Sequence, residues 1–507
     1  MITVEPIAIT ILVLYLVGLL LIGFISSRKS SEGLTDFFLA GRNLNKWTVA
    51  LSAVSSGRSA WLVLGVTGTA YATGLNAVWA IAGYISVEVF MFFYVAKRFR
   101  TYSENTGSIT VPDILETRFN DKKHVLRIVS AVIIIFFMIA YVGSQLVAGG
   151  GAFATSMGVS PTVGMWLTAF ILLAYTMLGG FHAVSKTDVI QAGFMFVSLV
   201  LLPTVAVIGL GGFGPILEAM NTEGGGFISP FAFGFGAIIG LIGIGFGSPG
   251  NPHILVRYMS LKNVKEMRQA ALISSVWNVL MGWGAVMIGL AGRAYFPDIN
   301  MLPNGNQEQV FLSLGSEILN PFFFGFLLVA VLAAIMSSAD SQLLVGSSAF
   351  IRDIYQKIIG KDKELPQKKL VFLSRLTTVV FMGLSLILAF TAQEFVFWMV
   401  LFAFGGLGAC FGPALLLSFY WKGVSKQGVL WGMITGLITV ILVKQQPQWT
   451  YAFLPDIKEL LNTYFFGITY EAVPGFIVAT IFTVVISLFT KKPDNAAEVL
   501  ESLKVSA

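Results

Sequence analysis

The chain has 507 residues, of which 56% are hydrophobic and only 11% are charged, and its formal net charge is +6. A water-soluble chain of this length needs far more charge to cover its surface, so the composition excludes a soluble protein and indicates that a bilayer solvates most of the chain. A single cysteine, Cys410, excludes a disulfide framework, and His124, His182 and His253 are scattered without metal-ligand spacing.

Thirteen segments are long and apolar enough to cross a membrane, for which a helix needs about 20 residues. The first is too long for a signal peptide and lacks its basic start, so we expect it to be retained. The sequence therefore predicts an all-α polytopic membrane protein with one transmembrane domain over 1–507. The predicted spans are 6–27, 46–72, 76–96, 124–152, 161–180, 188–211, 232–254, 268–294, 318–350, 370–391, 395–420, 427–444 and 471–490.

Basic residues predict the orientation, because cytoplasmic loops carry an excess of Lys and Arg. With the N-terminus outside and the C-terminus inside, most of the 32 Lys and Arg residues fall in inside loops, among them Arg257 after the seventh span. The outside loops then hold only Arg293, Lys444 and Lys458, and one arginine, Arg58, is left within the second span.

Two of the predicted spans are interrupted by residues that weaken a helix. Residues 52–61 of the second span are rich in Ser and Gly, and residues 243–252 of the seventh hold four Gly and two Pro. Paired interruptions in two halves of a membrane protein indicate a transporter's binding site. They predict two inverted units, 46–211 and 232–420. Alternatively, such glycines only allow helices to pack closely.

Three stretches carry a resemblance to a known family. They are Gly179–Gln191 around Thr187 and Asp188, Gly405–Pro413 followed by Tyr420–Gly423, and Ala333–Gln342 in the ninth span. Together they resemble the sodium/solute symporter family, most closely its proline-permease branch. The resemblance implies a LeuT-like core of five plus five inverted helices and sodium-driven import of a small organic solute by alternating access.

The resemblance also implies two sodium sites. The first would use backbone carbonyls near Ser55 and Arg58, the carbonyl of Ala334, and the hydroxyls of Ser337 and Ser338. The second would use Asp188, Ser338 and Ser341. The alternatives are packing for the serines, a solvated helix cap for Asp188, and a structural hydrogen-bond network for Asp340, an ionisable residue within a span.

The substrate site implied by the resemblance lies between the two interrupted spans. Proline permeases have an aspartate where this chain has Gly57 and aromatic residues where it has Ile244 and Ser248, so proline itself is not assured as the substrate. The positions are Ser56, Gly57, Ser59, Ala60, Trp61, Tyr141, Gln145, Ile244, Ser248 and Pro252.

Arg58 lies twelve residues from Lys46, about 18 Å deep, and Glu88 lies nine residues from Lys97, about 13–14 Å deep. An unpaired arginine at that depth is costly, which predicts an Arg58–Glu88 pair. Three interpretations stay open. The pair is structural and sodium coupling is intact, or the guanidinium replaces sodium in a sodium-independent or proton-coupled carrier, or Arg58 clamps the carboxylate of an anionic substrate.

The sequence thus predicts a secondary active transporter, not an enzyme, for an amino acid or carboxylate such as a proline-like compound. Sodium is the expected coupling ion, with a channel as a remote alternative. We expect a multi-pass protein of a bacterial or archaeal inner membrane that contacts lipid, works as a monomer and binds no nucleic acid.

Overall fold

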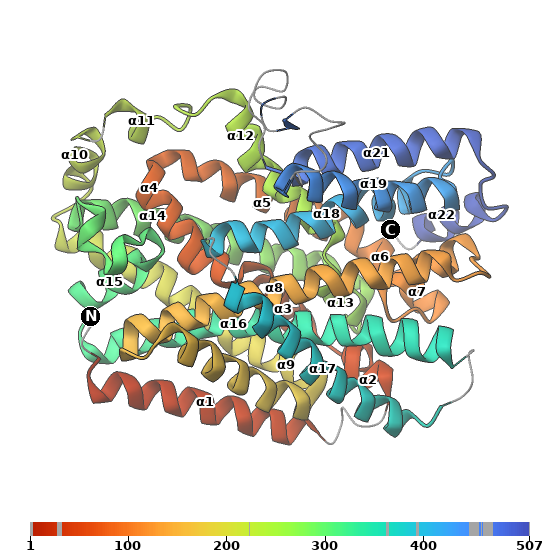
Figure 1. Ribbon diagram of the computed structural model, residues 1–507, viewed down its shortest axis with the longest axis horizontal. Coiled ribbons are helices and arrows are strands. Elements are labelled where there is room, and N and C mark those ends of the chain that lie inside the picture. The colour runs from red at the N-terminus through yellow and green to blue at the C-terminus, as the bar shows by residue number, and fades with distance from the viewer. Residues whose placement is uncertain are drawn as a thin grey trace.

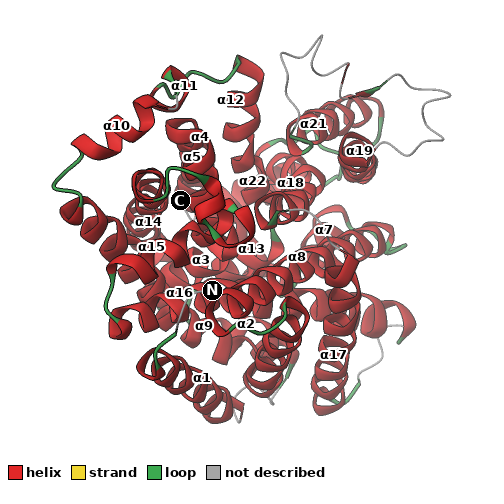
Figure 2. Cartoon of the chain, turned by 60° about the vertical axis from the view of Figure 1, so that its left-hand side comes forward, coloured by secondary structure: helices red, strands yellow, loops and turns green. Residues whose placement is uncertain are grey.

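The computed structural model describes residues 4–27, 33–222, 224–360, 365–391, 395–445, 456–457, 459 and 470–505. Lys458, one of the predicted outside cations, lies outside this part. The described residues form helices and loops and no strand (Figure 2). The α-helices are α1 (Pro6–Ser27), α2 (Leu34–Leu39), α3 (Lys46–Ala60), α4 (Thr67–Thr73), α5 (Val78–Phe90), α6 (Ala96–Thr106), α7 (Val111–Phe119), α8 (Val125–Met157), α9 (Pro161–Gly209), α10 (Gly214–Thr222), α11 (Gly225–Ile228), α12 (Phe235–Ile242), α13 (Pro252–Ser260), α14 (Met267–Tyr295), α15 (Val310–Ile318), α16 (Pro321–Ser348), α17 (Gln367–Thr391), α18 (Val396–Tyr420), α19 (Lys426–Gln445), α21 (Ala472–Phe489) and α22 (Ala496–Val505).

Within the described residues, ten continuous helical stretches are long and apolar enough to cross a bilayer. Two of them, Lys46–Thr106 with 61 residues and Pro161–Gly209 with 49, are far longer than one crossing needs. Each contains a glycine in the left-handed region, Gly74 with φ +64° and Gly180 with φ +51°, where the helix direction breaks. Thirteen crossings and the orientation of the termini stay predictions.

The long helices run side by side along the long axis of the molecule (Figure 1). In the turned view, α3 and α16 lie inside the bundle, while α1 and α17 lie at its rim (Figure 2). Helix α16 is almost entirely buried, whereas rim helices expose large apolar side chains such as Leu14, Phe24 and Phe489. Exposed apolar surface of this extent is what lipid covers, and it makes the chain a multi-pass membrane protein.

Local sequence explains where several spans begin. The side chain of Asn45 accepts a hydrogen bond from the Thr48 amide at 2.9 Å, and Asn320 caps α16 in the same way. Ser160 caps α9, whose first residue is a proline, as is the first residue of α16. A capping oxygen followed by Pro satisfies the free amides of the first turn and fixes the start of the helix.

Charges at one end of the bundle tie α7 to neighbouring helices. Arg127 of α8 is bonded to Asp113 at 2.6 Å, to Glu116 at 2.6 Å, and to Asp353 in the segment that follows α16. Burial alone would raise the pKa of the Asp113 carboxyl, but Arg352 and Arg127 outweigh it and hold that pKa below its usual value. The pKa of Glu116 is lowered in the same way, chiefly by its hydrogen bond with Arg127.

Candidate functional site

The first interruption lies at Ser59 in the buried second span. Its backbone has φ +42° and ψ −171°, and the helix continues as a π-helical stretch over Trp61–Val66. The Ala60 amide donates to Gln145 Oε1 at 3.1 Å, the Trp61 amide donates to Ser59 Oγ at 3.1 Å, and Tyr84 Oη donates to the Gly57 carbonyl at 2.9 Å. Side chains therefore satisfy backbone groups that the break would leave unpaired in an apolar environment.

The second interruption covers Gly243–Gly250, a 3₁₀ segment between α12 and α13, as the sequence predicts. Asn251 is extended, and its Nδ2 donates to the carbonyls of Gly247 at 2.7 Å and Phe404 at 2.9 Å. A Cβ on Gly250 would lie 2.2 Å from the Leu407 carbonyl oxygen, so only glycine fits where this segment crosses α18.

Oxygen atoms from α3 and α16 converge beside the first interruption. Ser337 Oγ donates to the Ser55 carbonyl at 3.1 Å and lies 3.2 Å from the Ala334 carbonyl. Ser338 Oγ donates to the Ser56 carbonyl at 2.8 Å. The structure thus brings together four of the residues predicted for the first sodium site, all buried, from positions 282 apart in the chain.

Arg58 points away from these oxygens. Its Nη2 lies 2.9 Å from Glu88 Oε2, its guanidinium stacks 3.7 Å from the centre of the Tyr84 ring, and both charged side chains are 2% or less exposed. Asn278 Nδ2 also donates to Glu88 Oε2, at 2.7 Å. The structure therefore brings Arg58 and Glu88 together, as the depth estimate predicts. The sequence analysis missed Tyr84 and Asn278, although Tyr84 lies one helical turn before Glu88.

At the second predicted sodium site the structure places a side chain that the sequence analysis expected elsewhere. Arg257, expected in an inside loop, is fully buried because α13 extends to Ser260, and its Nη2 lies 2.9 Å from Asp188 Oδ2 and 2.5 Å from Ser341 Oγ. A guanidinium thus lies where the resemblance implies an ion. Ser338 does not join this group, because its hydroxyl is bonded to the Ser56 carbonyl.

Asp340 lies next to this cluster. Its Oδ2 accepts a hydrogen bond from Tyr175 Oη at 2.7 Å, and its Oδ1 accepts one from Ser341 Oγ at 3.0 Å. These bonds fit the structural network that the sequence analysis gives as one alternative, and they connect Asp340 to Asp188 through Ser341 and Arg257.

All the residues predicted for the substrate site are buried, and several of them pack against other side chains. Trp61 stacks on Tyr84 and Phe397, with ring centres 5.5 and 6.1 Å apart, and Tyr141 meets His253 edge-on at 5.6 Å. Ser56 instead joins the Arg257 cluster at 2.5 Å. Gln145 lies on α8 and contacts the first interruption through its bond with the Ala60 amide. The remaining members lie along the two interrupted segments: Gly57, Ser59, Ala60, Ile244, Ser248 and Pro252.

Some buried polar atoms near the interruptions have no hydrogen-bond partner among the described residues. Among them are Arg58 Nη1, Trp61 Nε1, Ser248 Oγ, Asn251 Oδ1 and both ring nitrogens of His253. An unpaired buried donor costs free energy that a bound ligand can recover. The two interruptions therefore border on groups that can accept a polar solute.

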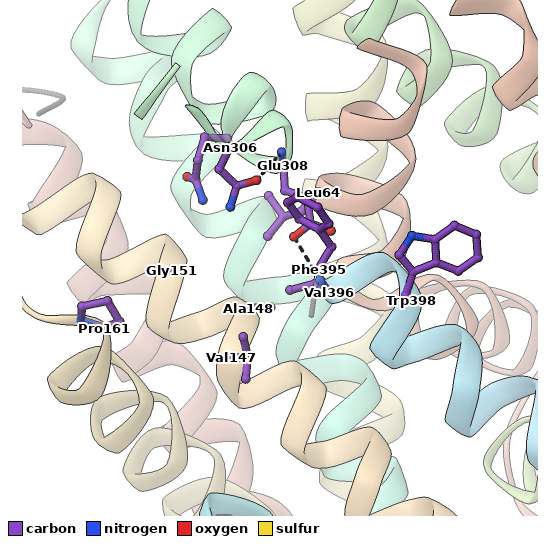
Figure 3. Close-up of a pocket in the computed structure, with 11 residues that line it drawn as sticks. Leu64, Val147, Ala148, Gly151, Pro161, Asn306, Glu308, Phe395, Val396 and Trp398 are labelled. Atoms are coloured by element: carbon purple, nitrogen blue, oxygen red, sulfur yellow. Dashed lines mark hydrogen bonds between the residues drawn. The ribbon is translucent and has the colours of Figure 1, made fainter. Parts of the chain in front are cut away.

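A pocket of about 380 Å³ lies at the end of α18 nearest to Trp61 (Figure 3). Glu308 lines it and accepts hydrogen bonds from the amides of Val396 at 3.0 Å and Phe397 at 2.9 Å, which caps α18. Burial raises the pKa of the Glu308 carboxyl, although these two backbone bonds oppose the rise. Because Phe397 stacks on Trp61, the aromatic contact connects this pocket to the first interruption.

The sequence is similar to those of several known proteins. Residues 37–436 match the model of the sodium:solute symporter family. The chain is 37% identical over 485 residues to the high-affinity proline transporter PutP of Bacillus subtilis (strain 168), covering 94% of this chain and 97% of that protein. It is 36% identical over 487 residues to a sodium/proline symporter of Staphylococcus aureus (strain COL), covering 96% and 93%.

Two solved structures share the fold. A Na⁺-coupled sialic acid symporter in a substrate-bound outward-open state matches with a TM-score of 0.78 at 20% identity, covering 96% of this chain and 99% of that one. Mhp1, a nucleobase-cation-symport-1 family transporter in a closed conformation, matches with a TM-score of 0.56 at 11% identity, covering 93% and 98%. At these identities the likeness concerns the fold alone.

Proposed function

Because the chain belongs to the sodium:solute symporter family and imports a small solute with sodium, we propose that its solute is a small zwitterionic amino acid of the proline type. Transport proceeds by alternating access through thirteen spans, with the N-terminus outside, in a bacterial or archaeal inner membrane. The two inverted units, 46–211 and 232–420, hold the solute between their interrupted helices. The names and full-length match of the proline-transporting relatives support the choice of solute.

One observation carries the sodium site in this proposal: oxygens from two helices meet within hydrogen-bond distance at Ser55, Ala334 and Ser337. Carbonyls freed by an unwound helix, together with hydroxyls, are the ligands that sodium takes in transporters of this architecture. In the described part of the chain no Lys or Arg side chain forms a hydrogen bond with these three residues, which favours an ion there.

The partners of Arg58 support the structural interpretation of its pair with Glu88. The guanidinium is held by Glu88 and the Tyr84 ring, so it does not take the place of sodium at the Ser337 hydroxyl. Its unpaired Nη1, together with Trp61 Nε1, gives a carboxylate two buried donors, one on each side of the break at Ser59. We therefore assign the solute's carboxylate to this side of the site.

Uptake into proteoliposomes tests the function. We expect radiolabelled proline to accumulate under an inward sodium gradient and not when choline replaces sodium, with unlabelled proline competing. Ser337→Ala removes one proposed sodium ligand and should raise the sodium concentration for half-maximal uptake about tenfold, the loss of roughly one hydrogen-bond-sized interaction. Ser86→Ala, on α5 and bonded only within its helix, is the matched control.

Two results would contradict the proposal. Equal uptake in sodium and choline would remove sodium as the coupling ion. Sodium-dependent uptake of another solute that proline does not inhibit would leave the coupling intact and change the substrate.

A further inference from the structure

Arg257 has an unusually complete set of oxygen partners for a buried side chain. It lies on α13, directly after the second interruption, and is 0% exposed. Nε donates to Ser52 Oγ at 3.0 Å, and Nη1 donates to the His253 carbonyl. The remaining nitrogen, Nη2, lies near three oxygens: Ser56 Oγ at 2.5 Å, Asp188 Oδ2 at 2.9 Å and Ser341 Oγ at 2.5 Å.

The atoms around Nη2 form a cation site in their own right. They are one carboxylate and two hydroxyls from three different helices, α3, α9 and α16, and all three residues are at most 1% exposed. Small hard cations take the same kinds of ligand. One carboxylate oxygen of the site, Asp188 Oδ1, has no hydrogen-bond partner among the described residues. The guanidinium therefore does not saturate the carboxylate that holds it.

A second carboxyl group lies at the edge of the cluster. Asp188 faces Arg257 directly, and Asp340 joins the same group because Ser341 Oγ lies 3.0 Å from Asp340 Oδ1 and near Arg257 Nη2. Asp188 pairs directly with the guanidinium, and Ser341 connects Asp340 to it, where all four residues are buried. A carboxylate with one oxygen unpaired, close to a second carboxyl group, offers a small cation ligands that the guanidinium does not use.

We propose that Arg257 is a tethered cation that competes with sodium for the oxygens of Asp188 and Ser341. The guanidinium holds these oxygens when sodium is absent, and a sodium ion that binds Asp188 displaces it. The inference rests on the proposed function in taking sodium as the ion, and it adds a competitor that belongs to the chain itself.

The exchange has a mechanical consequence for α13. The guanidinium connects the inner half of the interrupted span to Asp188 on α9 and Ser341 on α16. When sodium replaces it at Asp188, both of these connections are lost and α13 is free to move relative to the two long helices. Arg257 is then a positioning residue. When the ion binds, Arg257 is released from Asp188, and this release changes how the interrupted span is held.

Sodium titration of the purified full-length protein tests the proposal without any transport assay. The unfolding temperature is followed as sodium replaces choline at constant ionic strength, for the native protein, Arg257→Lys and Arg257→Gln. A ligand that binds the folded state raises this temperature in proportion to its occupancy.

We expect the sodium midpoint to fall in the order native, Lys, Gln, by about tenfold in total, because a weaker internal competitor leaves more of the site available to the ion. Arg118→Gln is the matched control, since Arg118 is another buried arginine and donates to the Ser418 carbonyl far along the chain from Asp188. Its midpoint should equal that of the native protein.

Free guanidinium provides a second, independent measurement. Arg257→Ala should leave a space of the size of the lost group, so that a few millimolar guanidinium chloride raises the sodium midpoint of this variant and not of the native protein. A structural salt bridge without competition predicts no such effect. If the Gln and Ala variants do not fold, the Lys variant alone tests the proposal. A lower sodium midpoint supports the competition, and an unchanged midpoint contradicts it.

The outcomes separate the two proposals. A native protein that responds to sodium, with the same midpoint in the Lys and Gln variants, overturns the competition and leaves sodium coupling intact. Folded variants that lose the sodium response also overturn it, since Arg257 would then assist the ion. No sodium response in any of the proteins overturns sodium coupling together with this inference.

Discussion

Two buried arginines on interrupted spans, Arg58 and Arg257, have nearly the same exposure and very different surroundings. Arg58 makes one hydrogen bond, to Glu88, and packs its flat face on Tyr84. Arg257 bonds to oxygens on every side, in a cluster that also contains two carboxylates. The first is a one-to-one pair, and the second is a cation held by one carboxylate together with four other oxygens.

This difference teaches that burial of a charge does not by itself define its role. A pair with balanced charges and an aromatic neighbour is fixed by packing, and losing either partner leaves the other uncompensated. A cation held by several hydroxyls and a carboxylate can exchange with another cation that takes the same kinds of ligand. The following predictions test the contrast, from the largest expected effect to the smallest.

Neutralising the acidic partner should cost far more at the first arginine than at the second. Glu88→Gln leaves Arg58 as an uncompensated buried charge and should destabilise the protein by about 3–5 kcal/mol. Asp188→Asn should cost clearly less, because four oxygens other than this carboxylate still accept hydrogen bonds from Arg257. Melting temperatures of the two purified variants without sodium give the comparison. Equal losses, or a larger loss for Asp188→Asn, would contradict the distinction.

Adding a methyl group at Gly57 should disturb the Arg58 side of the site through Tyr84. A Cβ there would lie 2.5 Å from Tyr84 Oη, and this ring cannot easily withdraw because Trp61 and Phe404 stack on it at 5.5 and 5.6 Å. We expect Gly57→Ala to cost about 1–3 kcal/mol by overpacking. The double variant Gly57→Ala/Tyr84→Phe removes the clashing oxygen and should melt above Gly57→Ala, whereas an unchanged or lower value would place the strain elsewhere.

A third arginine, Arg127, lies at the end of the bundle and has three acidic partners. It serves as a reference for the other two arginines. Because the folded-state pKa of Asp113 lies below its usual value, its ionised form stabilises the fold above the ordinary carboxyl pKa. That contribution is lost as the pH falls through the lowered folded-state pKa. The melting temperature should therefore decline in acid, and Arg127→Gln should make the decline shallower by about 1–3 °C.

One result of the pH series would contradict this prediction. If the native protein and Arg127→Gln lose stability in parallel below the ordinary carboxyl pKa, then the Arg127 pairs do not contribute to the acid dependence.

Much of the fold could be predicted from the sequence because bilayer length and apolar composition are local properties. The predicted limit 395–420 differs by one residue from the observed helix Val396–Tyr420, and the break over 243–252 coincides with Gly243–Gly250. Counting residues from the basic span ends also predicted that Arg58 meets Glu88, since depth along a helix follows from rise per residue.

The rest of the site could not be predicted, because it depends on contacts between helices that are far apart in the sequence. The positive-inside rule assigns basic residues near span ends to loops, so it placed Arg257 in an inside loop. In the structure α13 continues past Arg257 to Ser260, which this rule does not predict. Asn278 reaches Glu88 from a helix 190 residues away, and no local pattern predicts such a contact. The left-handed backbone of Ser59 was likewise invisible, since its sequence neighbourhood only weakens a helix and does not specify where it breaks.

The one cysteine of the chain, Cys410, lies in the interior of α18 and is fully buried. A thiol reagent applied to intact membranes therefore meets no accessible native target, and the protein is a ready background for single-cysteine labelling. A cysteine placed at Gln309, on the rim of the pocket, would react from one face of the membrane only. The face from which it reacts would reveal which way the whole bundle is inserted.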